Sequence, residues 1–243
     1  MPITWYDATV IAVEDLTPNV RLFRLKIESE ERFEFIPGQF ITLDLPVGEK
    51  RLQRWRSYSI SNISNDENIL ELCIAKMQDG LATTYLFDDV DIGSIIKFKG
   101  PEGNFVLPND LADKKLVLIC TGTGIAPFIS MIRGIIEAEI KVKSIHLIFG
   151  ARKKEDILYF DELSSLSDHH FSFSYDIALS REEDWAGYKG YVHQAYMKED
   201  GNSDDENTHY LICGWTKMID EAVANLLLKL KVDKSRIHYE LYG

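Results

Sequence analysis

The sequence has few cysteines and no long apolar run, and both features exclude classes of protein to which it could belong. Cys73, Cys120 and Cys213 are isolated and lack CxxC spacing, so neither a disulfide framework nor an iron–sulfur centre is predicted. The six histidines show no HExxH-type spacing, and no metal site is predicted. No stretch of about 18 apolar residues is present, so no membrane insertion is expected. The start MPITWYDATV lacks the pattern of a secretory signal, which favours a cytoplasmic location.

Positive charge is also scarce, since the formal net charge is −12. Binding to nucleic acid is not expected, because phosphate contacts need clustered lysines and arginines. The charge is unevenly spread: the stretch from Asp200 to Glu206 contains four acids and no basic residue, whereas the segment from Glu49 to Arg56 is basic. The basic segment contains Lys50, Arg51, Arg54 and Arg56. It is either a face that receives an acidic partner or an ordinary solvated loop.

The length of 243 residues, 45% of them hydrophobic, is enough for two modest domains. Residues 1–110 show short β-branched and aromatic runs between turns, and this spacing predicts an antiparallel β-barrel or sandwich with one short helix at Ala82–Phe87. From residue 111 to 243, apolar runs alternate with helical periodicity, which predicts an α/β domain with a doubly wound parallel sheet. The stretch Lys198–Asn207 is expected to be a surface loop.

The segment TGTGIAP, from Thr121 to Pro127, lies between a predicted strand and a predicted helix. Its glycines allow a tight turn and a close backbone approach, and the helix start offers free N–H groups to a pyrophosphate. The pattern departs from GxGxxG, and no acid closes the following strand, which ends at Arg152. A dinucleotide site is predicted, and a tight turn without a ligand is the alternative.

The segment WRSYSIS, from Trp55 to Ser61, is a predicted strand in the first half. Alternation places an arginine, a tyrosine and an isoleucine on one face and three serines on the other. Such a strand could bind a ligand that combines a charged phosphate, an aromatic ring system and a heteroatom that forms a hydrogen bond. An ordinary half-exposed strand would show the same pattern.

Together, and in the order β then α/β, these motifs resemble the ferredoxin–NADP reductase superfamily. The family's RxYS is matched by Arg56, Ser57, Tyr58 and Ser59, and its PGQF by Pro37–Phe40. The resemblance implies a barrel that binds FAD. In it, Arg56 pairs with the FAD pyrophosphate, Tyr58 packs on the flavin face, and Ser59 hydrogen-bonds near the reactive N5.

A second FAD element of the family is a Gly-x-x-Ser/Thr turn that opens a short helix. This sequence matches it with Gly80, Leu81, Ala82 and Thr83. Backbone N–H groups at a helix start bind pyrophosphate, and a threonine hydroxyl adds a donor. Lys76, just before this turn, is counted with the predicted cofactor-binding residues. Without the resemblance, the turn reads as an ordinary helix start.

In the second half, TGTGIAP resembles the family's nicotinamide loop, which makes Thr121, Gly122, Thr123 and Gly124 predicted cofactor contacts. The segment LICGW resembles the family's CG motif and implies that Cys213 lies beside the nicotinamide C4. A small polarizable side chain fits that place. A buried strand cysteine is the alternative.

The ending YELYG resembles the family's acid followed two residues later by an aromatic residue. The resemblance implies that Tyr242 covers the flavin face where nicotinamide must stack, and that Glu240 takes part in proton or hydride geometry. Gly243 extends the chain one residue past this pattern. Ser180 and Arg181 resemble the family's pair that selects NADPH, because an arginine fork suits a phosphate. Three acids follow them, so NADH is kept as the alternative.

The resemblance covers nearly the whole chain and implies an FAD-dependent ferredoxin/flavodoxin–NAD(P)+ oxidoreductase that uses NADPH. A separate carrier, ferredoxin or flavodoxin, is expected because no ferredoxin domain is appended, and a monomer is expected. Two alternatives share the same residues: a reductase component of an oxygenase or desaturase, and a diaphorase acting on free flavin or quinone. A third is a nucleotide-binding regulatory module without turnover, against which the RxYS motif and the terminal Glu240 and Tyr242 weigh.

Overall fold

The computed structural model describes residues 4–29, 31–197 and 205–242. They divide into two compact units, Met1–Leu107 with Ala126–Gly134, and Pro108–Ile125 with Ile135–Gly243. The prediction of one boundary near residue 110 did not include the return of Ala126–Gly134 to the first unit. Gly243 and most of the expected acidic loop lie outside the described residues. No helix of the described ranges is long and apolar enough to cross a membrane.

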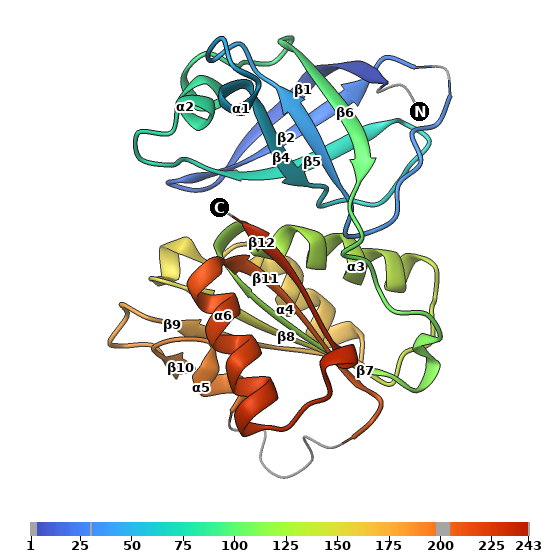
Figure 1. The fold of residues 1–243 in the computed structure, drawn as a ribbon, viewed down its shortest axis with the longest axis vertical. Coiled ribbons are helices and arrows are strands. Elements are labelled where there is room, and N and C mark those ends of the chain that lie inside the picture. Colours follow the sequence, from blue (N-terminus) through green and yellow to red (C-terminus); the bar gives the residue numbers. More distant parts are fainter. Residues whose placement is uncertain (1–3, 30, 198–204, 243) are drawn as a thin grey trace. The chain divides into compact units, whose positions relative to one another are not determined.

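The first unit holds a six-stranded antiparallel sheet in the order β4-β3-β6-β1-β2-β5 (Figure 1). A bridge between Ile60, just past β4, and Leu72 on β5 joins the two outer strands and closes the barrel. The elements are β1 (Trp5–Thr17), β2 (Val20–Ile27), β3 (Phe40–Asp44), α1 (Arg51–Arg54), β4 (Trp55–Ser59), β5 (Ile69–Ala75), α2 (Leu81–Asp88) and β6 (Ile95–Glu102). The predicted antiparallel barrel is thus confirmed.

The barrel closes around an apolar core that alternate strand residues supply. Phe23, Ile41, Phe98 and Leu72 are each 1% exposed or less and belong to one cluster. Every second side chain of a strand reaches this core, because successive strand residues point to opposite faces of the sheet. The predicted short helix is present as α2 and is one residue longer at each end. The helix α1, in the basic segment, was not predicted, because four residues carry too little periodicity to be seen.

The second unit holds a six-stranded parallel sheet in the order β10-β9-β8-β7-β11-β12. The strands are β7 (Lys115–Thr121), β8 (Ser144–Ala151), β9 (Phe173–Leu179), β10 (Tyr188–Lys189), β11 (Thr208–Trp215) and β12 (Ile237–Tyr242). The helices are α3 (Ala126–Glu137), α4 (Phe160–His169), α5 (His193–Tyr196) and α6 (Thr216–Ala224). The predicted doubly wound α/β fold is confirmed.

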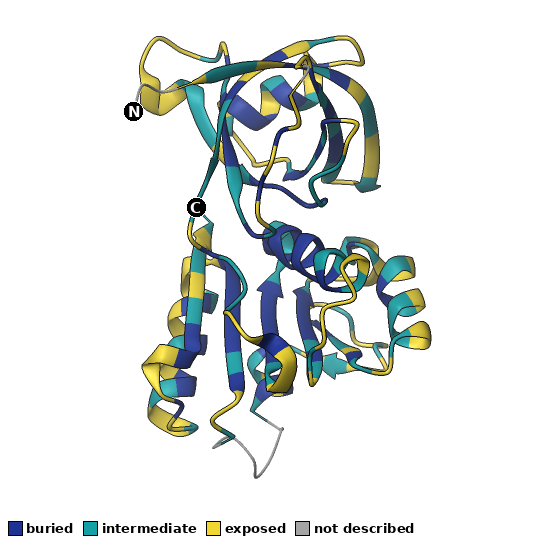
Figure 2. Cartoon of the chain, turned by 90° about the vertical axis from the view of Figure 1, so that its right-hand side faces the viewer, coloured by how far each residue is buried: buried dark blue, intermediate teal, exposed yellow. Residues whose placement is uncertain are grey.

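The central strands of this sheet are buried on both faces, as Figure 2 shows by their dark colour. β7 is buried at every position except its two ends, which explains why its sequence is a continuous apolar run rather than an alternating one. The chain runs outward from β7 through β8 and β9 and then returns to the other side of β7 as β11. The sheet therefore changes winding direction between β7 and β11, and ligands of such sheets bind at that point, beyond the carboxyl ends of the strands.

Candidate functional site

In the first unit, the motif RSYS occupies β4 as predicted. Tyr58 packs against the barrel core and Ser59 is 4% exposed, while Ser57 is exposed. Burial raises the pKa of the Tyr58 phenol to about 12, although the charge of Arg56 works in the opposite direction. The phenol therefore stays protonated and neutral at physiological pH, and it offers a ring face without a charge.

Two polar side chains of β4 are held by near neighbours. The Nη1 of Arg56 donates to the backbone oxygens of Leu52, at 2.8 Å, and of Trp55, at 2.7 Å. Ser57 Oγ lies 3.0 Å from Oγ1 of Thr42 on the paired strand β3. These bonds fix the guanidinium beside α1, so a positive charge stands at the start of the motif strand where the resemblance requires one.

The predicted pyrophosphate turn begins α2, with Gly80 as its N-cap and an exposed Leu81. Thr83 is 7% exposed, and its hydroxyl accepts from the Met77 N–H at 3.1 Å and donates to the Gly80 carbonyl at 3.1 Å. The hydroxyl therefore shapes the turn. The N–H groups of the first turn of α2 have no intrahelical acceptor, which suits a phosphate. Lys76 is paired with Asp88 at the far end of the helix, at 2.7 Å.

In the second unit, the TGTG segment follows β7 as a 3-10 turn, Gly122–Ile125, before α3. Gly122 has a φ of +53°, and a Cβ there would meet nothing within 4 Å. A Cβ on Gly124, in contrast, would lie 2.5 Å from the carbonyl oxygen of Cys213. The hydroxyl of Thr121 is buried without a hydrogen-bond partner. An open turn beside an unpaired hydroxyl fits a dinucleotide phosphate at the winding switch between β7 and β11.

The end of β11 and the end of β12 lie side by side in register. Cys213 is opposite Glu240 on β12 and opposite Cys120 on β7. Burial, reinforced by the charge of Glu240, raises the pKa of the Cys213 thiol well above its ordinary value, while a hydrogen bond with Tyr242 opposes the rise. Three predicted residues of the hydride-transfer site, Cys213, Glu240 and Tyr242, are thus brought together at one end of the sheet.

Ser180 and Arg181 follow β9 directly, as predicted. The Ser180 N–H donates to the carbonyl of Ala151 at 3.1 Å, and the Arg181 N–H donates to the carbonyl of Arg152 at 2.8 Å. Two exposed arginines, Arg152 and Arg181, therefore follow adjacent strands. Arg152 was not predicted as a binding residue, although its place at the end of an apolar run was visible. Of the acids nearby, Glu182 accepts from the N–H of Lys154 at 3.2 Å.

The comparisons with known proteins agree with this architecture. The model of an oxidoreductase FAD-binding domain matches residues 7–107, and that of an oxidoreductase NAD-binding domain matches residues 118–224. Ferredoxin–NADP reductase B of Sorangium cellulosum is 30% identical over 98% of this chain and 97% of its own length. This chain belongs to the ferredoxin–NADP reductase family. It is an oxidoreductase with an FAD-binding and an NAD(P)-binding domain, and the sequence resemblance is confirmed.

Two further relatives show that this pair of domains occurs in chains of different length. The phenol hydroxylase P5 protein of Acinetobacter pittii is 30% identical over 98% of this chain, which spans 65% of that protein. A ferredoxin NADP+ reductase from Neisseria gonorrhoeae, solved with bound FAD and NADP, is 25% identical, with a TM-score of 0.81 and 99% coverage of both chains. The same fold thus occurs alone and as about two thirds of a longer chain.

Proposed function

We propose that this family member transfers electrons between NADPH and a one-electron carrier protein of the ferredoxin or flavodoxin type. The observation that supports this most is the winding switch of the second unit, where the open TGTG turn touches the strand end that carries Cys213. When bound, FAD would supply the redox chemistry, which is exchange of a hydride, two electrons with one proton, with NADP(H) and of single electrons with two carrier molecules.

In the FAD-binding domain, the protein's own groups bind and orient the cofactor. Arg56 and the first turn of α2, from Leu81 to Thr83, are proposed to hold the pyrophosphate through charge and N–H donors. Tyr58, a neutral phenol whose pKa burial raises further, to about 12, is proposed to pack on the flavin ring. Ser59 is proposed to hydrogen-bond near N5, where the hydride arrives.

In the NAD(P)-binding domain, the turn Thr121–Gly124 is proposed to bind the dinucleotide phosphates, and Cys213 to lie against the nicotinamide. Tyr242 is proposed as the ring that shields the flavin, with Glu240 orienting the reacting groups. Cys213 stays a protonated thiol because burial raises its pKa, so it serves as a small polarizable contact and not as a nucleophile. Ser180, Arg181 and the newly found Arg152 are proposed to bind the 2′-phosphate of NADPH, since arginine forks match phosphate oxygens.

The carrier dock is proposed on the exposed basic residues of the segment around α1, because an acidic carrier is attracted to positive charge. Lys50 and Arg51 are exposed. Arg54, which the sequence placed with them, makes two bonds of 2.8 Å to Asp44, so its charge is already neutralised. Reversal of Lys50 and Arg51 to glutamate is expected to slow carrier reduction and to spare ferricyanide reduction, whereas Lys97→Glu on β6 should change neither. Equal loss with both acceptors would exclude this dock.

A reductase component of an oxygenase is the second candidate function, and it rests on the likeness to the phenol hydroxylase P5 protein. Acceptors distinguish the candidates: cytochrome c reduction that depends on added ferredoxin or flavodoxin supports the first, and rapid reduction of free flavin or quinone alone supports a diaphorase.

The decisive experiment mixes the FAD-loaded protein anaerobically with NADPH and, separately, with NADH. Bleaching of the flavin absorbance by NADPH at a much higher rate supports the proposed phosphate site. Preferential bleaching by NADH would keep the oxidoreductase and reject the role proposed for Ser180 and Arg181. Absence of bleaching by either would reject the proposed function.

A further inference from the structure

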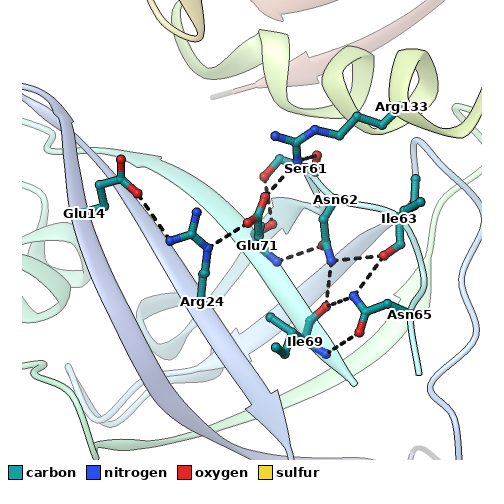
Figure 3. Close-up of polar contacts among 9 residues, drawn as sticks. All are labelled: Glu14, Arg24, Ser61, Asn62, Ile63, Asn65, Ile69, Glu71 and Arg133. Carbon is teal, nitrogen blue, oxygen red and sulfur yellow. Dashed lines mark hydrogen bonds and ion pairs between the residues drawn. The ribbon is translucent and has the colours of Figure 1, made fainter. Parts of the chain in front are cut away.

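A carboxylate on β5 is shared between two arginines from distant parts of the chain (Figure 3). The side chain of Glu71 is only 13% exposed, and its two oxygens lie 2.8 Å from Nε of Arg24 and 2.8 Å from Nη1 of Arg133. Arg24 belongs to the neighbouring strand β2, whereas Arg133 comes from α3. Because a largely buried charge is costly when a partner is removed, this arrangement strongly favours one position of α3 in the first unit.

A second set of bonds ties α3 to the chain that follows the motif strand β4. Ser130, which is fully buried, donates its hydroxyl to the carbonyl of Asn62 at 2.6 Å, and Arg133 also donates to the carbonyl of Ser61 at 3.2 Å. Ser61 and Asn62 come two and three residues after Ser59. Asn62 in turn accepts from the N–H of Glu71 at 2.9 Å. The helix, the residues after the flavin strand and β5 therefore form one hydrogen-bonded network, which Figure 3 draws without Ser130.

The same helix also packs closely on the PGQF turn. A Cβ on Gly134 would lie 3.0 Å from Cγ of Pro37, and a Cβ on Gly38 would lie 2.6 Å from Cε of Met131. A glycine inside a helix costs about 1 kcal/mol relative to alanine, and the close approach to Pro37 accounts for its presence here. Thus α3 contacts the PGQF turn and the two residues, Ser61 and Asn62, that follow the RSYS strand.

The first residue of α3 follows the nicotinamide turn without a linker. The turn Gly122–Ile125 belongs to the second unit, whereas Ala126–Gly134 belongs to the first. The segment held by Arg133 and Glu71 and the turn are therefore continuous in the backbone. A shift of about 1 Å in a reacting group's position can cost on the order of a hundredfold in rate.

We propose that Arg133 and Glu71 are positioning residues for hydride transfer: they hold α3 on the FAD-binding unit and thereby fix the end of the nicotinamide turn. The proposal rests on the function proposed above. It assigns to this network a role in the reaction, although none of its side chains is a proposed contact of either cofactor.

The test compares Arg133→Met with the unaltered protein and with Arg32→Met. Arg32 pairs with Asp66 at 2.8 Å on the surface of the same unit, so its substitution removes an arginine ion pair of equal length elsewhere. Stopped-flow bleaching at saturating NADPH is expected to slow by roughly tenfold or more in Arg133→Met. FAD content and the rate of flavin reduction by dithionite, which needs no nicotinamide site, are expected to match the unaltered protein.

Arg133→Lys, which keeps the charge, is expected to retain part of the rate that Arg133→Met loses. The control Arg32→Met is expected to react at the rate of the unaltered protein. NADPH rates in Arg133→Met equal to those of the unaltered protein would overturn the inference, as would a parallel fall with NADPH and dithionite. If Arg133→Met fails to retain FAD, Ser130→Ala takes its place with the same criteria. Absence of bleaching in the unaltered protein would overturn the proposed function together with this inference, whereas equal bleaching of all variants overturns the inference alone.

Discussion

The contact between Gly124 and Cys213 provides the sharpest prediction about the nicotinamide turn. A Cβ on Gly124 would lie 2.5 Å from the carbonyl oxygen and 2.8 Å from the carbonyl carbon of Cys213, both of them backbone atoms. Ordinary contacts begin near 3.4 Å, so Gly124→Ala must separate the turn from β11 by about 0.9 Å. Overpacking of this kind typically costs about 1–3 kcal/mol.

For a chain of this size, 1 kcal/mol corresponds to about 2–4 °C in Tm. The Tm of Gly124→Ala, measured by circular dichroism, is therefore expected to fall by roughly 2–12 °C. Its rate of flavin bleaching by NADPH should also fall at least tenfold or so, because the turn moves by nearly an ångström.

Gly122→Asn is the matched control for stability. Its Cβ meets nothing within 4 Å, and asparagine tolerates the φ of +53° found there. Its Tm should therefore change by less than that of Gly124→Ala. If Gly124→Ala is as stable as the unaltered protein and is reduced at the same rate, the close approach of turn and strand is not the constraint inferred here.

Three further predictions concern the same domain and the cysteines. Arg181→Ala is expected to raise the KM for NADPH by about tenfold to a hundredfold, because a charged hydrogen bond is lost, and to leave the KM for NADH unchanged. An equal rise of the two KM values would show that Arg181 does not bind the 2′-phosphate. Burial lowers the pKa of His209 and of His238 from 6.5, with the charge of His238 adding to the effect on His209. Because the folded state favours the neutral rings, their stabilisation is present above pH 6.5 and is lost on acidification below it. The free energy of unfolding by urea should fall between pH 7.5 and 5, and it should fall less steeply in His209→Gln. The same dependence on pH in both proteins would contradict the role given to His209. Cys73, Cys120 and Cys213 are buried, and burial raises the pKa of the latter two. Ellman's reagent at pH 8 should label them only after denaturation, and rapid labelling of the native protein would show that the site is open.

Much of the architecture could be predicted from the sequence because it depends on local periodicity. The alternating residues around Phe23 and Ile41 specify barrel strands, and the continuous apolar run of β7 specifies a strand covered on both faces. The TGTG turn was visible because of its glycines: Gly122 has a positive φ, which favours glycine, and Gly124 lies too close to the backbone of β11 for any side chain. Order and spacing of the motifs then sufficed to identify the family.

Pairings between distant residues could not be predicted, because they depend on how strands and helices come together. Sequence placed Arg54 among the docking charges, and only the β3–β4 register showed it bound to Asp44. Arg152 became a candidate phosphate ligand only when β8 and β9 were seen to be adjacent and parallel.

The division between sequence and structure is clearest at α3. Its apolar periodicity predicts a helix after the nicotinamide turn, and the sequence by itself determined that much. The assignment of Ala126–Gly134 to the FAD-binding unit, through Arg133 and Glu71, was decided by tertiary structure alone. A hydrogen bond between residues 62 positions apart leaves no periodic trace in a sequence, because it needs only one donor and one acceptor that folding brings within 3 Å.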